Sequence, residues 1–210
     1  MPSFLLLNKF RFTLAGALVA SAFCALPLAY ADAIPGQAAP AFSLTDTAGK
    51  KVSLADYKGK HVVLEWVNPG CPYVRKHYDS KNMQSLQDGA LKKNVVWLAI
   101  NSTNPSHQDY LAPAAMADYM KKQNAAASAT LMDSDGKVGL SYGAKTTPHM
   151  YVIDPQGKVV FAGGIDDKRS SRVEDVKTAK NFVAAALDDS LSGKPVQVAS
   201  AIPYGCSVKY

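Results

Sequence analysis

The sequence of 210 residues contains only three cysteines and no C-x-x-C pair. The missing pair argues against a structural zinc site and against a dithiol redox motif of the usual spacing. Lysine and arginine form no block and do not alternate with aromatic residues, so nothing indicates nucleic-acid binding. The sequence also has no glycine-rich phosphate loop, no paired catalytic carboxylates and no Gly-x-Ser-x-Gly elbow. The cysteines themselves are therefore the candidates for chemistry.

Residues 1–31 resemble a secretory signal peptide. Lys9 and Arg11 lead an apolar stretch, the segment has no acidic residue, and residues 29–31 form a small-x-small cleavage site. The alternative is a retained membrane anchor, because the apolar stretch is close to the length needed to span a bilayer. We expect cleavage to remove Cys24 and to leave a periplasmic or secreted protein without a membrane segment.

Cys71 lies between a largely apolar run and a polar run. The run from His61 to Val67 predicts a buried strand, and the residues from Arg75 onward predict a helix. Pro72 suits the first helical position, where its missing N–H costs nothing. The sulfur is then expected at a helix N-terminus, where unpaired N–H groups and the helix dipole stabilise a thiolate. We predict that Cys71 is a reactive thiol.

Cys206 is the second cysteine of the expected mature chain. It lies on a tail, residues 192–210, that three helix breakers make extended, and Gly205 beside it indicates mobility and permits close approach. An even pair in an exported chain suggests a disulfide, worth about 4 to 5 kcal/mol in the chain-entropy model. Two interpretations remain open: Cys71 and Cys206 form a working redox pair, or a permanent disulfide pins the tail.

The apolar pattern predicts an α/β chain. Continuous apolar runs beside helices are typical of a parallel sheet that is buried on both faces. The polar segment 163–172 is expected to be a surface loop. Strands are predicted at 61–67, 95–100 and 131–133, hairpins at 42–54 and 150–162, and helices at 72–87, 112–123, 137–142 and 173–191.

The order of these elements, with Cys71 after the first buried strand and Thr147-Pro148 before the later hairpin, resembles the thioredoxin fold. The chain is similar to redoxins of the alkyl hydroperoxide reductase and thiol-specific antioxidant superfamily. The resemblance implies one redoxin domain over residues 32–191, with a central mixed sheet flanked by helices and an added N-terminal hairpin. The matching segments are 36–42, 56–60, the stretch around Cys71 and 142–148.

The resemblance implies a thiol-disulfide oxidoreductase. Cys71 occupies the first of the two thioredoxin cysteine positions and Val74 the second, so the chain is similar to a peroxiredoxin-like subgroup with this arrangement. The peroxiredoxin pattern P-x-x-x-T/S-x-x-C fits neither position. Cys71 alone would stay in a mixed disulfide, and Cys206 is the candidate that resolves it. The alternatives are a thiol-dependent peroxidase and a non-catalytic binding domain with a structural disulfide.

The resemblance assigns further site residues. Glu65 lies six residues before Cys71, where thioredoxins bury an acidic proton acceptor; an exposed strand edge or a lysine partner is the alternative. Pro148 corresponds to the cis-proline opposite the active cysteine, and the backbone of Thr147 would pair with a partner's extended peptide. Thr147, Pro148 and Pro72 are therefore the expected substrate-binding residues.

We expect no cofactor and no metal. Cys71, His77 and His149 could ligate copper or zinc, but the chain offers no supporting ligand pair. Arg75 and Lys76 would favour the thiolate, although such charges usually form a solvated helix face. The expected partners are protein thiols or disulfides, with a thioredoxin-like reductant among them, and neither nucleic acid nor a membrane.

Overall fold

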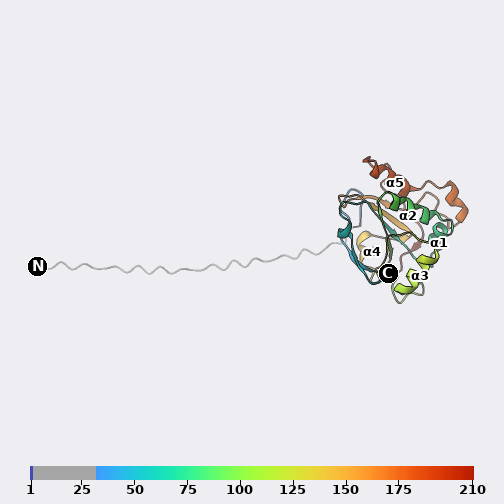
Figure 1. Cartoon of the computed structure of the whole chain (residues 1–210), viewed down its shortest axis with the longest axis horizontal. Coiled ribbons are helices and arrows are strands. Elements are labelled where there is room, and N and C mark those ends of the chain that lie inside the picture. The colour runs from blue at the N-terminus through green and yellow to red at the C-terminus, as the bar shows by residue number, and fades with distance from the viewer. Residues whose placement is uncertain (2–31) are drawn as a thin grey trace.

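The computed structural model describes Met1 and residues 32–210 (Figure 1). The expected signal peptide and Cys24 lie outside the described residues. Within them, no helix is long and apolar enough to cross a membrane.

Seven strands form one mixed sheet in the order β2-β1-β5-β4-β3-β7-β8. β3, β4 and β5 run parallel to one another, and β1 and β7 pair antiparallel with β5 and β3. This arrangement confirms the predicted α/β fold with a mixed central sheet and an N-terminal hairpin. The strands are β1 (Ser43–Asp46), β2 (Lys51–Ser53), β3 (Val62–Trp66), β4 (Val96–Asn101), β5 (Ala129–Met132), β7 (His149–Ile153) and β8 (Val159–Gly163).

Apolar side chains of β3 and the residue after it point alternately to the two faces of the sheet, so both faces are covered. Val63 and Val67 belong to one apolar cluster, whereas Leu64 and Trp66 belong to the other. The first cluster packs against α1, α2, α3 and α5, and the second against α4 and the 3-10 turn η1. The helices are α1 (Pro72–Asp79), α2 (Asn82–Lys92), α3 (Pro113–Lys122), α4 (Lys137–Tyr142) and α5 (Phe182–Leu191), with 3-10 turns η1 (Leu54–Tyr57) and η2 (Val173–Thr178).

The helix predicted at 72–87 is two helices. α1 ends at Asp79 and α2 begins at Asn82, because Lys81 adopts a left-handed conformation with φ of 64°. The predicted end at residue 87 is also wrong, because α2 continues through Gly89 to Lys92. Neither the left-handed lysine nor the continuation past the glycine has a sequence signal, since lysine is not a usual residue for this conformation.

The helix predicted at 173–191 is also interrupted. η2 covers its first six residues, and α5 starts only after Asn181, whose side chain accepts a hydrogen bond from Ala184 N at 2.9 Å. Asparagine is a favoured N-cap residue, and here it begins a new helix. The preceding segment, predicted as a surface loop, is buried at its start, from Gly163 to Asp166.

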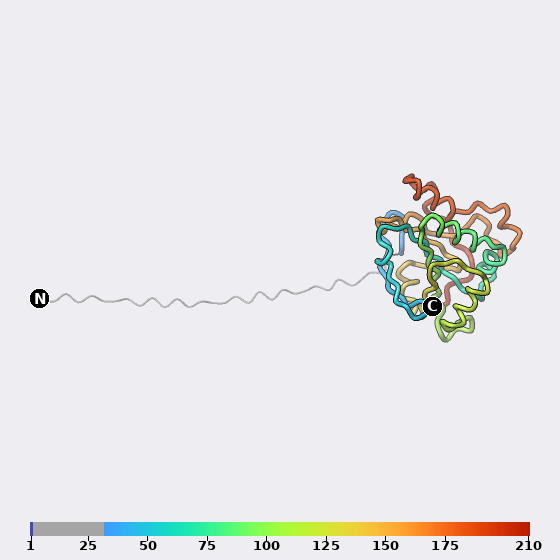
Figure 2. The backbone as a smooth tube through the Cα atoms, in the orientation of Figure 1, coloured from blue at the N-terminus to red at the C-terminus, as the bar shows by residue number. Residues whose placement is uncertain are grey.

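The C-terminal tail is extended, as predicted, but it is docked along the molecule and is not a free arm. It pairs with β8 through an Ala162–Ser200 bridge and then forms β9 (Cys206–Ser207), which pairs with β6 (Thr146–Thr147). Figure 2 shows this return from α5 across the molecule to the C-terminus. Gly163 allows the approach, because a Cβ there would lie 2.1 Å from the carbonyl oxygen of Ala201.

Candidate active site

Cys71 lies where the sequence placed it, between β3 and α1. It is the N-cap residue of α1, Pro72 is the first helical residue, and the side chain is only 2% exposed. Its Sγ donates a hydrogen bond to the carbonyl oxygen of Thr147 at 3.0 Å. The backbone N–H groups of the first helical turn therefore face the sulfur, which is the geometry that favours a thiolate.

The loop opposite Cys71 has the expected cis-proline. The Thr147–Pro148 peptide bond is cis, and Thr147 belongs to the short strand β6. The edge of β6 that was predicted to pair with a partner's peptide is occupied by the protein's own tail. In that pairing Cys206 lies directly opposite Thr147.

The pairing of β9 with β6 thereby brings together two cysteines that lie far apart in the sequence. No disulfide joins them in this structure, and both are free thiols, Cys71 buried and Cys206 half-buried. Cys71 Sγ is hydrogen-bonded to the carbonyl oxygen of Thr147, the residue opposite Cys206, and each thiol shifts the pKa of the other. The expected proximity of the pair is thus present, although its redox role stays a prediction.

The environment makes the two thiols unequal. Burial raises the pKa of the Cys71 thiol, but the neighbouring polar groups of Cys206, Thr147 and Val74 outweigh it and leave the pKa below its ordinary value. Burial, the hydrogen bond to Cys71 and the charge of its thiolate raise the pKa of Cys206 to about 11. Cys71 therefore ionises first, and Cys206 keeps its proton.

Glu65 is fully buried in the middle of β3. Its carboxylate accepts hydrogen bonds from Tyr78 Oη at 2.8 Å, Trp97 Nε1 at 2.8 Å and Gln87 Nε2 at 3.1 Å. Neither an exposed edge nor a lysine partner accounts for it, so those alternatives are wrong. Its bonds tie α1, α2 and β4 together, and its role as a proton acceptor for Cys71 stays a prediction.

Burial also raises the pKa of Glu65, against the opposing effect of its three hydrogen-bond donors. The stability that this carboxyl contributes is therefore complete below its unfolded-state pKa of about 4.3 and is lost as pH rises through its folded-state pKa. We expect the free energy of unfolding of wild type, relative to Glu65→Gln, to decrease as pH rises above about 4.3. Urea unfolding of both proteins over a pH series measures this difference; a flat or rising difference would refute the assignment.

Lys76 and His77 do not form a solvated face and do not lie at the sulfur. Lys76 is 1% exposed and pairs with Asp166, Nζ to Oδ2, at 3.5 Å. His77 contacts the hydroxyl of Tyr204 at 3.2 Å through Nε2. His149, the third residue considered for metal ligation, lies against the ring of Tyr151 with the ring centroids 4.7 Å apart. No sequence signal indicates the Lys76–Asp166 pair, since 90 residues separate its members.

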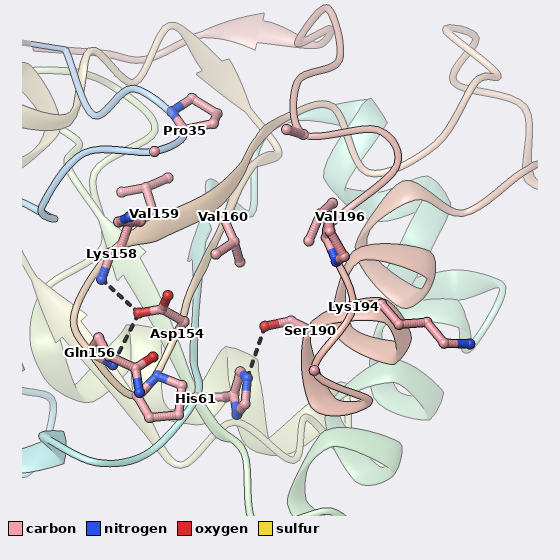
Figure 3. A pocket seen from close by; sticks show the side chains of 15 residues that line it. Pro35, His61, Asp154, Gln156, Lys158, Val159, Val160, Ser190, Lys194 and Val196 are labelled. Atoms are coloured by element: carbon pink, nitrogen blue, oxygen red, sulfur yellow. Dashed lines mark hydrogen bonds between the residues drawn. The ribbon is translucent and has the colours of Figure 1, made fainter.

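A surface pocket of about 730 Å³ lies at the other end of β3 (Figure 3). Its polar side chains include His61, just before β3, and Ser190 of α5, which are hydrogen-bonded at 2.9 Å. Cys71 follows the opposite end of the same strand, so this pocket is separate from the cysteine site.

Comparisons with known proteins agree with this geometry. Thiol-disulfide oxidoreductase ResA of Bacillus thuringiensis is 28% identical over 125 residues, which cover 60% of this chain and 66% of that protein. A Mycobacterium tuberculosis protein whose name places it provisionally among the peroxiredoxins is 28% identical over 144 residues, 61% of this chain and 83% of its own. The match therefore spans just under two thirds of the length of ResA.

The solved structures show the same fold. An uncharacterized conserved protein from Geobacillus kaustophilus superposes with a TM-score of 0.72 at 29% identity, over 85% of this chain and 93% of that one. The thioredoxin domain of a thiol-disulfide oxidoreductase from Bacteroides vulgatus has a TM-score of 0.50 at 24% identity, over 69% of this chain and 96% of that one. The AhpC/TSA family model matches residues 35–162, which include Cys71 and Pro148 but end before the tail. The chain belongs to the AhpC/TSA family and has its thioredoxin-like fold.

Proposed function

We propose that this protein is an exported thiol-disulfide oxidoreductase in which Cys71 is the nucleophile and Cys206 the resolving cysteine. The observation that carries the proposal is the pairing of Cys206 with Thr147 in β6, because the carbonyl oxygen of the same Thr147 accepts a hydrogen bond from Cys71 Sγ at 3.0 Å. A tail with only a structural role would not need Cys206 to lie opposite Thr147, beside the cis-proline. Export to the periplasm or the medium rests on residues 1–31 of the sequence.

The reaction begins at the Cys71 thiolate. It attacks one sulfur of a partner disulfide, so that a mixed disulfide forms and the partner's other sulfur leaves as a thiolate. Cys206 then attacks the sulfur of Cys71, its proton passes to the departing partner sulfur, and a Cys71–Cys206 disulfide forms. The partner gains two electrons and one proton from the protein, and its first sulfur, which left as a thiolate, takes its proton from solvent. The same steps reversed oxidise a partner dithiol, and a thioredoxin-like reductant would regenerate the reduced form.

Other residues support these steps in the proposal. Glu65, with a raised pKa and a hydrogen bond from Tyr78 of α1, is the proposed proton acceptor. Pro72 and Pro148 border the sulfur from the helix and from the loop, and the Thr147 backbone is the strand edge at which a partner peptide would pair. A partner peptide can pair with that edge only after β9 has moved away from it.

Reaction with oxidised glutathione tests the proposed Cys71–Cys206 exchange directly. After incubation of the reduced protein, we expect peptide mapping by mass spectrometry to find Cys71 linked to Cys206, and a reducing thiol to reverse the link within minutes. A link that forms but resists reduction would indicate the structural disulfide of a non-catalytic binding domain. The absence of any link would refute the proposal.

A thiol-dependent peroxidase is the second candidate, because the buried Cys71 beneath the docked tail favours a small oxidant. The residue at the place of the missing peroxiredoxin threonine is Asn68, whose Nδ2 donates to Thr103 Oγ1 at 3.2 Å while its Oδ1 accepts from Gly70 N at 2.7 Å. Asn68 is thus engaged and not free to orient a peroxide. We expect the reduced protein to consume hydrogen peroxide no faster than the Cys71→Ser variant; consumption that depends on Cys71 would favour the peroxidase.

A further inference from the structure

A buried cluster of polar side chains lies between α1 and the tail, outside the chemistry described so far. Lys76, His77 and Asp166 are each no more than 2% exposed. Lys76 Nζ donates to the carbonyl oxygen of Lys168 at 2.6 Å and pairs with Asp166 at 3.5 Å. Burying an ion pair costs desolvation energy, so a buried Lys76–Asp166 pair indicates a structural or functional role.

Tyr204 of the tail occupies the centre of this cluster. Its hydroxyl donates to Asp166 Oδ1 at 2.5 Å and lies 3.5 Å from Lys76 Nζ and 3.2 Å from His77 Nε2. Nδ1 of His77 faces Asn82 Nδ2 at 2.9 Å and accepts from it, so Nε2 carries the proton and donates to Tyr204. Burial and Lys76 lower the pKa of His77 to about 3, which keeps the ring neutral with that single proton.

The cluster joins the two elements that carry the cysteines. Lys76 and His77 lie on α1, which begins immediately after Cys71, and Tyr204 lies two residues before Cys206. Tyr73, also on α1, contacts the ring of Tyr204 edge-on with centroids 6.0 Å apart. The side chain of Tyr204 is therefore fixed to the same helix whose N-terminus bears the nucleophile.

We infer that Tyr204 is a positioning residue, which the Lys76–His77–Asp166 cluster holds so that Cys206 stays in register with Thr147 and within reach of Cys71. The inference rests on the proposed function, because it concerns the step in which Cys206 attacks Cys71. β6 pairing fixes the tail on one side of Cys206, and the cluster fixes it on the other. Such fixation raises the effective concentration of the attacking thiol.

The rate of the resolving step tests this. The reduced protein is mixed with oxidised glutathione, and quenched samples are analysed by mass spectrometry for the Cys71–glutathione adduct and for the Cys71–Cys206 disulfide. We expect Tyr204→Phe to convert adduct into disulfide about tenfold more slowly, since a lost hydrogen bond to a charged group is worth about that factor. We also expect ultraviolet thiolate absorbance to show a higher Cys71 pKa, because Cys206 donates less often.

Tyr210→Phe is the matched control. Tyr210 is the other anchored tyrosine after α5, and its hydroxyl donates to the neutral carbonyl oxygen of Ala144 at 2.7 Å. Its loss should change the resolving rate by only about twofold, the lower end for a neutral hydrogen bond. The β9–β6 pairing and the hydrogen bond from Val208 N to Lys145 O at 3.1 Å still hold the chain between Tyr210 and Cys206. All rates are measured well below the melting temperature of each variant, so that loss of stability alone does not alter them.

Two results would overturn the inference, and they are distinguishable. Equal rates in Tyr204→Phe and Tyr210→Phe, with resolution intact in wild type, would mean that the cluster only stabilises the fold. No resolution in wild type would defeat the proposed function and this inference with it. If Tyr204→Phe does not fold, Asn82→Ala provides the test: it frees the His77 ring without touching the tail, and an unchanged resolving rate would contradict the inference.

Discussion

Replacing Cys206 with serine is expected to trap Cys71 as a mixed disulfide. In wild type the Cys71–glutathione adduct has a thiol beside it, because Cys206 pairs with Thr147 next to Cys71. A hydroxyl in the same place cannot attack the disulfide, so most molecules of the variant should carry glutathione while few wild-type molecules do. Intact-protein mass spectrometry after treatment with oxidised glutathione distinguishes the two states.

Cys71→Ser is the control for this trap. This variant removes the Cys71 contribution to the raised pKa of Cys206, but burial still raises that pKa, so Cys206 should stay largely protonated at neutral pH and form the adduct much more slowly. Equal labelling of the two single variants would contradict the assignment of Cys71 as the nucleophile. Rapid loss of glutathione from Cys206→Ser without an added thiol would contradict the assignment of Cys206 as the resolving group.

Gly205→Ala is expected to separate the cysteines without altering either of them. Gly205 has φ of 135°, and a Cβ there would lie 2.0 Å from the carbonyl oxygen of Thr147, a rigid backbone atom. The tail must move away from β6, so the resolving step should slow by at least about tenfold, and the Cys71 pKa should rise as the Cys206 donors leave. The adduct assay gives the rate, and thiolate absorbance gives the pKa.

Gly193→Ala separates this clash from backbone strain. Gly193 begins the same tail with φ of 69°, but a Cβ there would meet no atom within 4 Å among the described residues, its chain neighbours aside. Alanine at such a conformation costs about 1 kcal/mol of stability and should leave the resolving step unchanged. Similar resolving rates in the two variants would show that the docking of β9 on β6 does not control the reaction.

The sheet was predictable because its signals are local. Continuous apolar runs predicted β3 and β4, and the predicted hairpin at 150–162 and helix at 137–142 correspond to β7–β8 and α4. The place of Cys71 at a helix N-terminus followed from the same local pattern together with Pro72. Each of these features depends on neighbours within a few residues, which a single sequence displays.

The surroundings of the site were not predictable in this way. The tail was expected to be mobile, yet Tyr204 and Tyr210 anchor it on either side of Cys206. Lys76 was expected in solvent, yet it lies buried on Asp166, and the Asp166 segment was expected on the surface. Pairings between residues so far apart in the sequence depend on tertiary packing, and no residue type or spacing predicts them.

The reduction potential of the Cys71–Cys206 pair tests the central claim most directly. The protein is equilibrated in glutathione redox buffers and its free thiols are counted, with Cys71→Ser and Cys206→Ser as controls. We predict a reversible two-electron couple above about −230 mV that is lost in either variant. A disulfide that stays oxidised in buffers below about −300 mV would be a structural link, and the proposed exchange reaction would be wrong.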